Sequence, residues 1–132
     1  MSTPIIPIRV VLLNAVTTGT SDWVSLKNYV APALFITGAG TISTGTLIVE
    51  EAEWDDNGPV YTGTPSTIYF TIPPSTTPVS SIDLTALTGG SPSKQQSLKL
   101  RGPNAYGYIR VRVGTDVTGA GGSVTAVLRD TV

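Results

Sequence analysis

Short runs in which apolar and polar residues alternate dominate the chain. Ile68, Phe70 and Ile72, for example, are separated by single residues of more polar character. Alternation with a period of two is typical of a strand with one buried face, and Gly, Pro, Asn or Asp clusters end each run. About nine such segments can be distinguished. Strands are expected at residues 8–16, 21–26, 33–37, 46–54, 67–72, 80–87, 97–101, 106–113 and 123–130.

Helical periodicity is not sustained over three turns anywhere in the sequence. The run SSIDLTAL fits a single helical turn with Ser81 as N-cap, but it fits strand alternation equally well. Many short strands joined by Gly-rich turns predict an all-β fold, an antiparallel β-sandwich of jelly-roll-like or related Greek-key type. We expect a single β-sandwich domain over residues 8–132, preceded by an extended N-terminal arm over residues 1–7.

The N-terminal arm has its own pattern. Pro4 and Pro7 keep it extended, and Ile5 and Ile6 lie between them. The arm is too short to fold alone, so the two isoleucines are expected either to cover the parent domain or to bind a neighbouring protein.

Composition narrows the classes of function. Charged residues are 13% of the chain, about half the usual share, and the net charge is −1, which gives no attraction to nucleic acid or anionic lipid. Cysteine and histidine are absent, which removes the commonest nucleophile–base pairs and transition-metal ligands. The apolar run at Val10–Leu13 is too short to span a membrane, and the N-terminus lacks the features of a signal peptide. We expect no cofactor, no membrane partner and synthesis in the cytoplasm without Sec export.

The stretch Glu50–Gly58 holds five of the nine acidic residues. In an extended strand Glu51 and Glu53 point to one face and Glu50 to the other, so the carboxylates do not converge. The spacing of an EF-hand is not met, and nothing supplies the opposite wall of a two-carboxylate hydrolase. The stretch therefore predicts a solvated hairpin end with Asn57 or Gly58 at positive φ. A weak Ca²⁺ or Mg²⁺ site and a carboxylate-only hydrolase are the alternatives.

The segment following residue 106 offers the main candidate for a partner contact. A period of two places its apolar members on the core face: Ile109, Val111 and Val113. Its polar members then share the outer face: Tyr108, Arg110 and Arg112. Tyrosine and arginine are enriched in interface hot spots, so this face could bind carboxylates of a partner protein. Alternatively, the arginines pair with acids on a neighbouring strand and the face is solvated.

Trp23 and Trp54 have two interpretations as well. Each could stack on a sugar ring, as in carbohydrate-binding sandwiches, or could pack in the core or at a hairpin end. The two Gly-rich runs after residues 37 and 118 lack the GxGxxG pattern and a following helix, so they predict turns rather than phosphate loops.

The order of several runs resembles a known class of proteins. These runs are DWVSLKNY, TGAGTISTGT, LIVEEAEWDDNG, YIRVRV and TGAGGSVTAVL, spread over residues 10–128. The chain resembles the small jelly-roll-like head decoration, or cement, proteins of tailed bacteriophages. The resemblance implies a structural protein on the outer capsid surface of the virion, which binds across junctions of the major capsid protein, often as a dimer or trimer. It carries no catalytic motif.

The sequence thus predicts a non-enzymatic capsid decoration protein, with Ile5, Ile6, Tyr108, Arg110 and Arg112 as candidate partner-binding residues. The alternative is a binding module of a phage tail or fibre that recognises a host glycan through exposed Trp or Tyr side chains.

Overall fold

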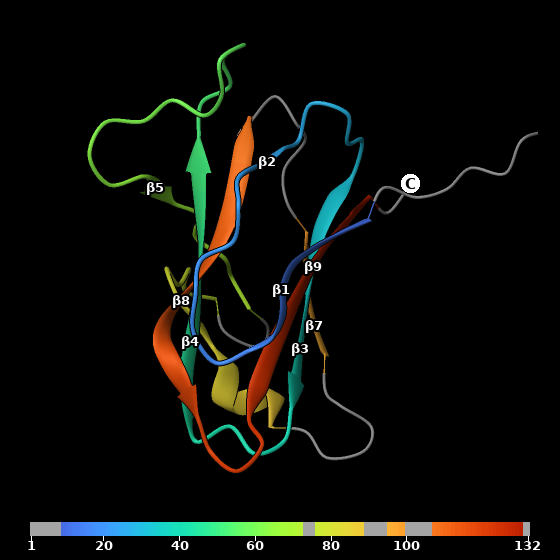
Figure 1. Cartoon of the computed structure of the whole chain (residues 1–132), viewed down its shortest axis with the longest axis vertical. Helices are drawn as coiled ribbons and strands as arrows, with labels where there is room; N and C mark the ends of the chain where they lie inside the picture. Colours follow the sequence, from blue (N-terminus) through green and yellow to red (C-terminus); the bar gives the residue numbers. More distant parts are fainter. Residues whose placement is uncertain (1–8, 73–75, 89–94, 100–106, 131–132) are drawn as a thin grey trace, which may run out of the picture.

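The chain folds as an antiparallel β-sandwich, as the strand pattern predicts (Figure 1). The computed structural model describes residues 9–72, 76–88, 95–99 and 107–130. Its elements are β1 (Arg9–Val16), β2 (Val24–Ser25), β3 (Pro32–Ala39), β4 (Thr44–Ala52), β5 (Ser66–Thr67), β6 (Ile82–Asp83), the 3₁₀ turn η1 (Leu84–Leu87), β7 (Gln95–Lys99), β8 (Tyr108–Thr118) and β9 (Ser123–Asp130).

The strands form two sheets whose pairing is nested along the chain. The first sheet has the order β1-β9-β3-β7, and the second has the order β2-β8-β4-β5, with β6 also paired to β4. β1 therefore pairs with β9, β2 with β8, β3 with β7, and β4 with β5 and β6. This is a long hairpin rolled into two layers, which is the arrangement of a jelly roll.

Alternate residues of the facing strands fill the space between the sheets. Leu47 on β4 and Ile109 on β8 meet Leu34 on β3 and Leu128 on β9, and all four side chains are fully buried. Burying a side chain of this size contributes about 1.5–3 kcal/mol relative to leaving it exposed. The core faces of β4 and β8 are thus fixed, and their alternate residues must form an outer surface.

Two tight turns meet at one end of the sandwich. The backbone N–H of Thr41 donates to the carbonyl of Ala120 at 3.0 Å, and that of Ser43 donates to the carbonyl of Thr118 at 2.7 Å. Gly119, at φ +123°, lies so close that an added Cβ would come within 2.1 Å of the Thr41 carbonyl oxygen. Only glycine allows this approach, which connects the β3–β4 turn to the β8–β9 turn.

The run SSIDLTAL, for which the sequence allowed either a helical turn or a strand, contains both. The short strand β6 leads directly into the 3₁₀ turn η1. The N-cap is Asp83 rather than Ser81. Oδ1 of Asp83 accepts hydrogen bonds from the backbone N–H of Thr85 at 3.0 Å and from its hydroxyl at 2.8 Å. These two bonds lower the pKa of the Asp83 carboxyl, and a charged acceptor makes the stronger cap.

The N-terminal arm, including Ile5 and Ile6, lies outside the described residues, so its predicted role stays a prediction. Within the described ranges, no helix is long and apolar enough to cross a membrane.

Candidate functional site: an arginine-aromatic surface

The outer face of the second sheet carries the polar residues of β8, as the alternation predicts. Ile109 and Val111 are fully buried on the core side, whereas Arg110 and Arg112 retain access to solvent on the other side. Tyr108, at the start of β8, is half-buried and is the register partner of Ala52 on β4 and Ser25 on β2. The three candidate residues on β8 therefore share one face, although Tyr108 lies at its end.

Glu50 on β4 is the buried centre of this face. It is the direct cross-strand partner of Arg110 and is only 1% exposed. Its Oε1 accepts a hydrogen bond from Nε of Arg110 at 2.9 Å and lies 3.5 Å from Nε of Arg112. The expectation that Glu50 belongs to a solvated hairpin end is therefore wrong, because two guanidinium groups cover the carboxylate.

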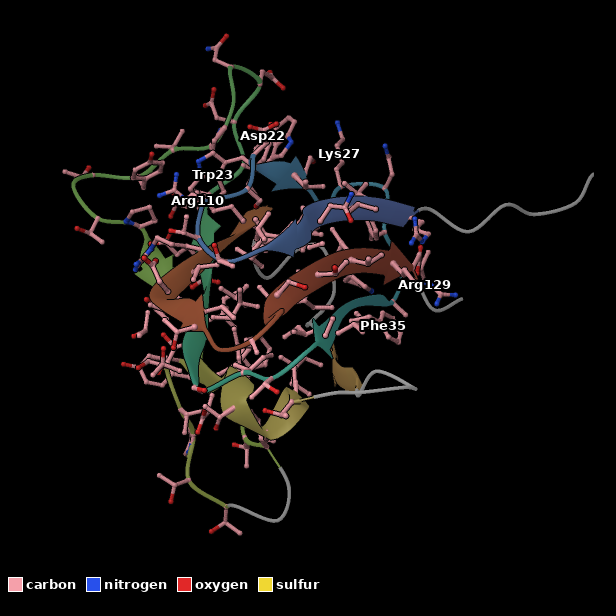
Figure 2. The ribbon with its side chains drawn as sticks, turned by 60° about the horizontal axis from the view of Figure 1, so that its bottom comes forward. Asp22, Trp23, Lys27, Phe35, Arg110 and Arg129 are labelled. Atoms are coloured by element: carbon pink, nitrogen blue, oxygen red, sulfur yellow. The ribbon has the colours of Figure 1, made fainter. Side chains whose placement is uncertain are left out.

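The guanidinium of Arg110 is also flanked by two aromatic rings. Its central carbon lies 4.5 Å from the ring centroid of Trp23 and 5.9 Å from that of Tyr61. The two rings contact each other, with centroids 5.5 Å apart and planes inclined by 41°. Figure 2 shows Trp23 next to Arg110 on this face of the ribbon. We refer to Glu50, Arg110, Arg112, Trp23 and Tyr61 as the arginine-aromatic cluster.

The charges of the cluster do not cancel. Two guanidinium groups share one carboxylate, so the five residues of the cluster carry one formal positive charge. The side chains of Arg110 and Arg112 are 21% and 37% exposed, so both arginines reach the surface. A guanidinium held by a carboxylate and two rings loses little further freedom on binding, which favours its use in recognition.

The acidic hairpin beyond β4 has the predicted turn. Glu53 and Val60 exchange backbone hydrogen bonds of 3.2 and 3.0 Å. The N–H of Gly58, at φ +123°, donates to the carbonyl of Asp55 at 3.0 Å, and Oδ1 of Asp55 accepts from the N–H of Asn57 at 2.9 Å. The exposed tip of the hairpin agrees with the expectation for residues 53–58.

Aromatic residues near this hairpin are exposed. Trp54 and Tyr61 are each 43% exposed, and Val60, which precedes Tyr61 in the sequence, is 49% exposed. Nζ of Lys27 lies 4.6 Å from the ring centroid of Trp54, so one region of that ring faces a cation. The interpretation of Trp23 as a core residue is wrong, since it is half-buried and belongs to the arginine-aromatic cluster rather than to the hydrophobic core. The sequence analysis did not predict Tyr61 as a member of this site, because it lies in an irregular segment with no alternating pattern.

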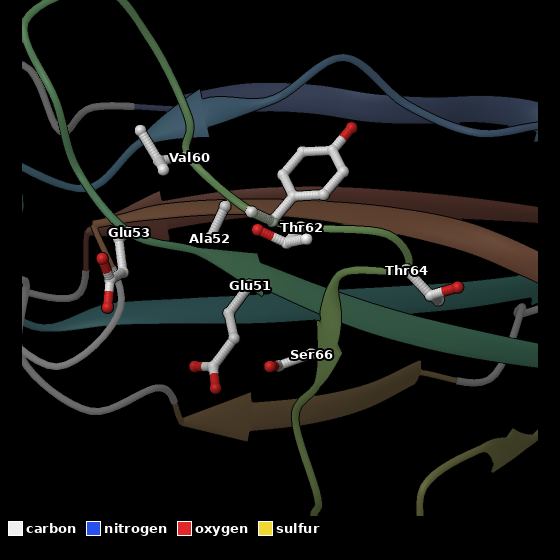
Figure 3. A pocket seen from close by; sticks show the side chains of 8 residues that line it. Glu51, Ala52, Glu53, Val60, Thr62, Thr64 and Ser66 are labelled. Carbon is white, nitrogen blue, oxygen red and sulfur yellow. The ribbon is translucent and has the colours of Figure 1, made fainter.

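A groove of about 430 Å³ lies beside the cluster, between the end of β4 and residues 60–66. Its lining includes Glu51, Glu53, Tyr61, Thr64 and Ser66. Figure 3 shows Glu51 and Ser66 on one side of the β4 edge, and Val60 on the other.

The acidic residues are separated by the pleat of β4. Glu50 faces the arginines, and alternation directs Glu51 to the opposite side. Over the described part of the chain, no three His, Cys, Asp or Glu side chains group together in a way that could hold a metal ion. The two alternatives of a metal site and a carboxylate pair gain no support from this geometry.

Comparison with known proteins shows the fold. No family model matches the chain, and no curated protein matches it significantly. Among solved structures, the chain is similar to the SPBc2 prophage-derived protein YomS, with a TM-score of 0.55 and 13% sequence identity over 98% of this chain and 99% of the other. At that identity the likeness concerns the sandwich fold, over nearly the whole length of both chains.

Proposed function

We propose that this β-sandwich is a non-enzymatic structural protein of a phage particle that decorates the capsid. In this proposal it sits on the outer surface of the virion, binds across junctions of the major capsid protein and works as a homo-oligomer. The fold it shares with a prophage-derived protein over almost the full length supports the phage context, as does the resemblance in the order of its motifs.

The observation that carries the proposal is the arginine-aromatic cluster. Trp, Tyr and Arg are the side chains most enriched in interface hot spots, and here they meet on one solvent-facing sheet surface. Glu50 orients Arg110 before any partner arrives, so binding costs less side-chain entropy. A decoration protein needs contact area and complementarity rather than chemistry.

The charge of the cluster suggests what the capsid surface should present. One unbalanced positive charge and the outward donors of Arg112 fit a carboxylate on the partner. The exposed ring of Tyr61, near the guanidinium of Arg110, provides apolar area beside that charge. A partner surface with an Asp or Glu beside an apolar patch would match both features.

The decisive experiment is decoration of purified capsids that lack the protein. Tyr61→Ala and Arg112→Gln should each lower the number of copies bound per capsid, since they remove an exposed ring and the unbalanced charge. Tyr69→Ala is the matched control, because Tyr69 is 64% exposed and lies outside the cluster. Wild-type occupancy for both cluster variants would refute the proposed contact surface.

Location in the virion needs a separate measurement. Mass spectrometry of purified phage particles, quantified against the major capsid protein, should give copy numbers on the scale of the shell. A few copies per particle would instead place the protein in the tail or neck.

A further inference from the structure

We infer that the outer face of the first sheet is the surface through which one copy of this chain binds the acidic hairpin of a second copy. The inference rests on the proposed function in one respect, namely that the protein is a homo-oligomer, and it names the two surfaces that meet. Neither surface includes a residue of the arginine-aromatic cluster. One molecule can therefore bind a second copy and the proposed capsid partner at the same time.

Strand register places five side chains together on the outer face of the first sheet. Val11 on β1 pairs with Val127 on β9, and Val127 pairs with Phe35 on β3. Two residues further along the same strands, Arg9 pairs with Arg129. Because residues i and i+2 of a strand share a face, the two arginines lie beside the apolar row (Figure 2). We refer to these five residues as the outer patch.

The apolar row of the outer patch is not part of the core. Val11 is exposed and Phe35 is half-buried. Val127 is buried, yet it does not belong to the hydrophobic cluster between the sheets, whereas its sequence neighbour Leu128 does. The row therefore lies on the side of the sheet away from the core, where a partner could remove more of its apolar area from water.

Arg9 and Arg129 bring two positive charges to the outer patch. They are direct cross-strand partners, and like charges in that position destabilise a sheet. Among the described residues, neither arginine forms an ion pair. Asp130 is next in sequence, but its carboxylate accepts hydrogen bonds from the N–H groups of Val30 at 2.9 Å and Ala31 at 2.8 Å. The arginine pair therefore favours a carboxylate from a partner.

Protection of the sheet edge does not explain this pair of arginines. A charge on an edge strand discourages pairing with other strands, which would account for Arg9 on β1. Arg129 is on β9, which lies between β1 and β3 in the sheet. Its central guanidinium carbon lies 5.0 Å from the ring centroid of Phe35. This contact places the charge over the apolar row, which suits a partner with a carboxylate beside an apolar group.

The hairpin after β4, residues 53–60, has the matching composition. Three of its residues are acidic and none is basic: Glu53, Asp55 and Asp56. All three acids are exposed, and so are the apolar side chains of Trp54 and Val60. Nζ of Lys27 lies 4.6 Å from the ring centroid of Trp54, so one ammonium group faces three carboxylates and the hairpin region stays negative. Its charge and apolar area complement those of the outer patch.

The two surfaces can meet only between different molecules. The outer patch faces away from the second sheet, whereas the acidic hairpin extends beyond the end of β4 in that sheet (Figure 1). One chain cannot lay its own hairpin on its own outer patch, because the core of the sandwich separates them. Each copy would therefore use both surfaces, and the assembly is complete when the arrangement closes on itself.

Analytical ultracentrifugation of the full chain tests the contact. The patch variant carries Arg9→Glu with Arg129→Glu, and the hairpin variant carries Glu53→Lys with Asp56→Lys. Asp55 is kept because its carboxylate accepts a hydrogen bond within the turn. Each double variant should weaken self-association at least about a hundredfold, since like charges would then face each other. Combining all four substitutions in one chain should restore association, because opposite charges meet again.

A matched variant and a change of salt serve as controls. Asp116→Lys reverses an exposed charge on β8, outside both surfaces, and should associate as the wild type does. Raising the salt from about 0.1 M to about 1 M should weaken wild-type association, because it shortens the Debye length from about 10 Å to about 3 Å. The inference is overturned if the wild type is a monomer, or if either double variant associates as the wild type does. It is also overturned if the combined variant is folded by circular dichroism and remains a monomer.

Capsid decoration by the same variants separates this inference from the proposed function. If the patch variant loses decoration but associates as the wild type does, the outer patch binds the capsid, and only this inference fails. A wild-type monomer would remove the homo-oligomer from the proposed function as well. Arg112→Gln, within the arginine-aromatic cluster, should lower decoration and leave self-association unchanged.

Discussion

Glu50 and Arg110 are directly opposite each other on β4 and β8, and the carboxylate is the buried partner while the guanidinium covers it. Arg110 is in turn covered by Trp23 and Tyr61. The outer face is therefore layered: the Glu50 carboxylate pairs with the Arg110 guanidinium, and this guanidinium contacts the rings of Trp23 and Tyr61. The stability of this face and the partner binding that we propose for it would depend on the same contacts.

Replacing the buried acid should destabilise the fold. Glu50→Gln leaves two neighbouring guanidinium groups without their shared counter-charge, and we expect a loss of about 2 kcal/mol, less than for a fully buried pair because the arginines reach water. Urea unfolding at neutral pH measures it. Glu53→Gln, at the exposed hairpin, is the control and should change stability by less than about 0.5 kcal/mol. Equal effects of the two variants would contradict the central role of Glu50.

Lysine should not replace arginine in the cluster. In Arg110→Lys a single ammonium group cannot donate from the Nε position to Glu50 and also keep the contacts of the guanidinium with the Trp23 and Tyr61 rings, so a loss of about 1 kcal/mol is expected. Arg129→Lys is a matched control, because Arg129 is exposed and contacts only one ring among those described, that of Phe35 at 5.0 Å. Thermal unfolding should rank Arg110→Lys below Arg129→Lys, and the reverse order would speak against the layered arrangement.

Two glycines allow the effect of a steric clash on stability to be measured apart from the effect of backbone strain. Gly119 and Gly19 have nearly the same φ, +123° and +127°, but only Gly119 has neighbours within 4 Å of an added Cβ. Gly19→Ala should cost about 1 kcal/mol from the backbone alone, and Gly119→Ala at least about 2 kcal/mol more because the Thr41 carbonyl must move. Chemical denaturation compares them. Similar losses in both variants would show that the two turns are not closely packed.

The cap of η1 should make stability depend on pH in the acid range. The pKa of Asp83 is lowered in the folded chain by hydrogen bonds from Thr85, so this carboxyl stabilises the fold above its unfolded pKa, about 3.9. That contribution is lost as the pH falls through the lowered folded value. Asp83→Asn keeps a cap but cannot titrate. The stability difference between wild type and Asp83→Asn should therefore shrink between neutral pH and about pH 3, as measured by urea unfolding. A difference that stays constant would contradict the charged cap.

Local sequence determined the strands and their faces. The alternation of Ile109 and Val111 with Arg110 and Arg112 decided which side of β8 is buried, because a strand's side chains alternate whatever it pairs with. The turn at Asp55–Gly58 followed from residues that favour it without any distant contact. The all-β class and most strand positions could be predicted for the same reason.

Only the tertiary structure decided which residues become neighbours on the outer face of the sheet. The burial of Glu50 depends on the register of β4 against β8, residues 60 positions apart, and no local pattern carries that register. Trp23 and Tyr61 join the same site from two irregular segments, which have no period to read. The groove exists because residues 61–65 leave the ladder between two paired points. Whether a segment forms a strand depends mainly on residues close in sequence. Which side chains meet in a site depends on how the strands pair, and that pairing is fixed by packing over the whole chain.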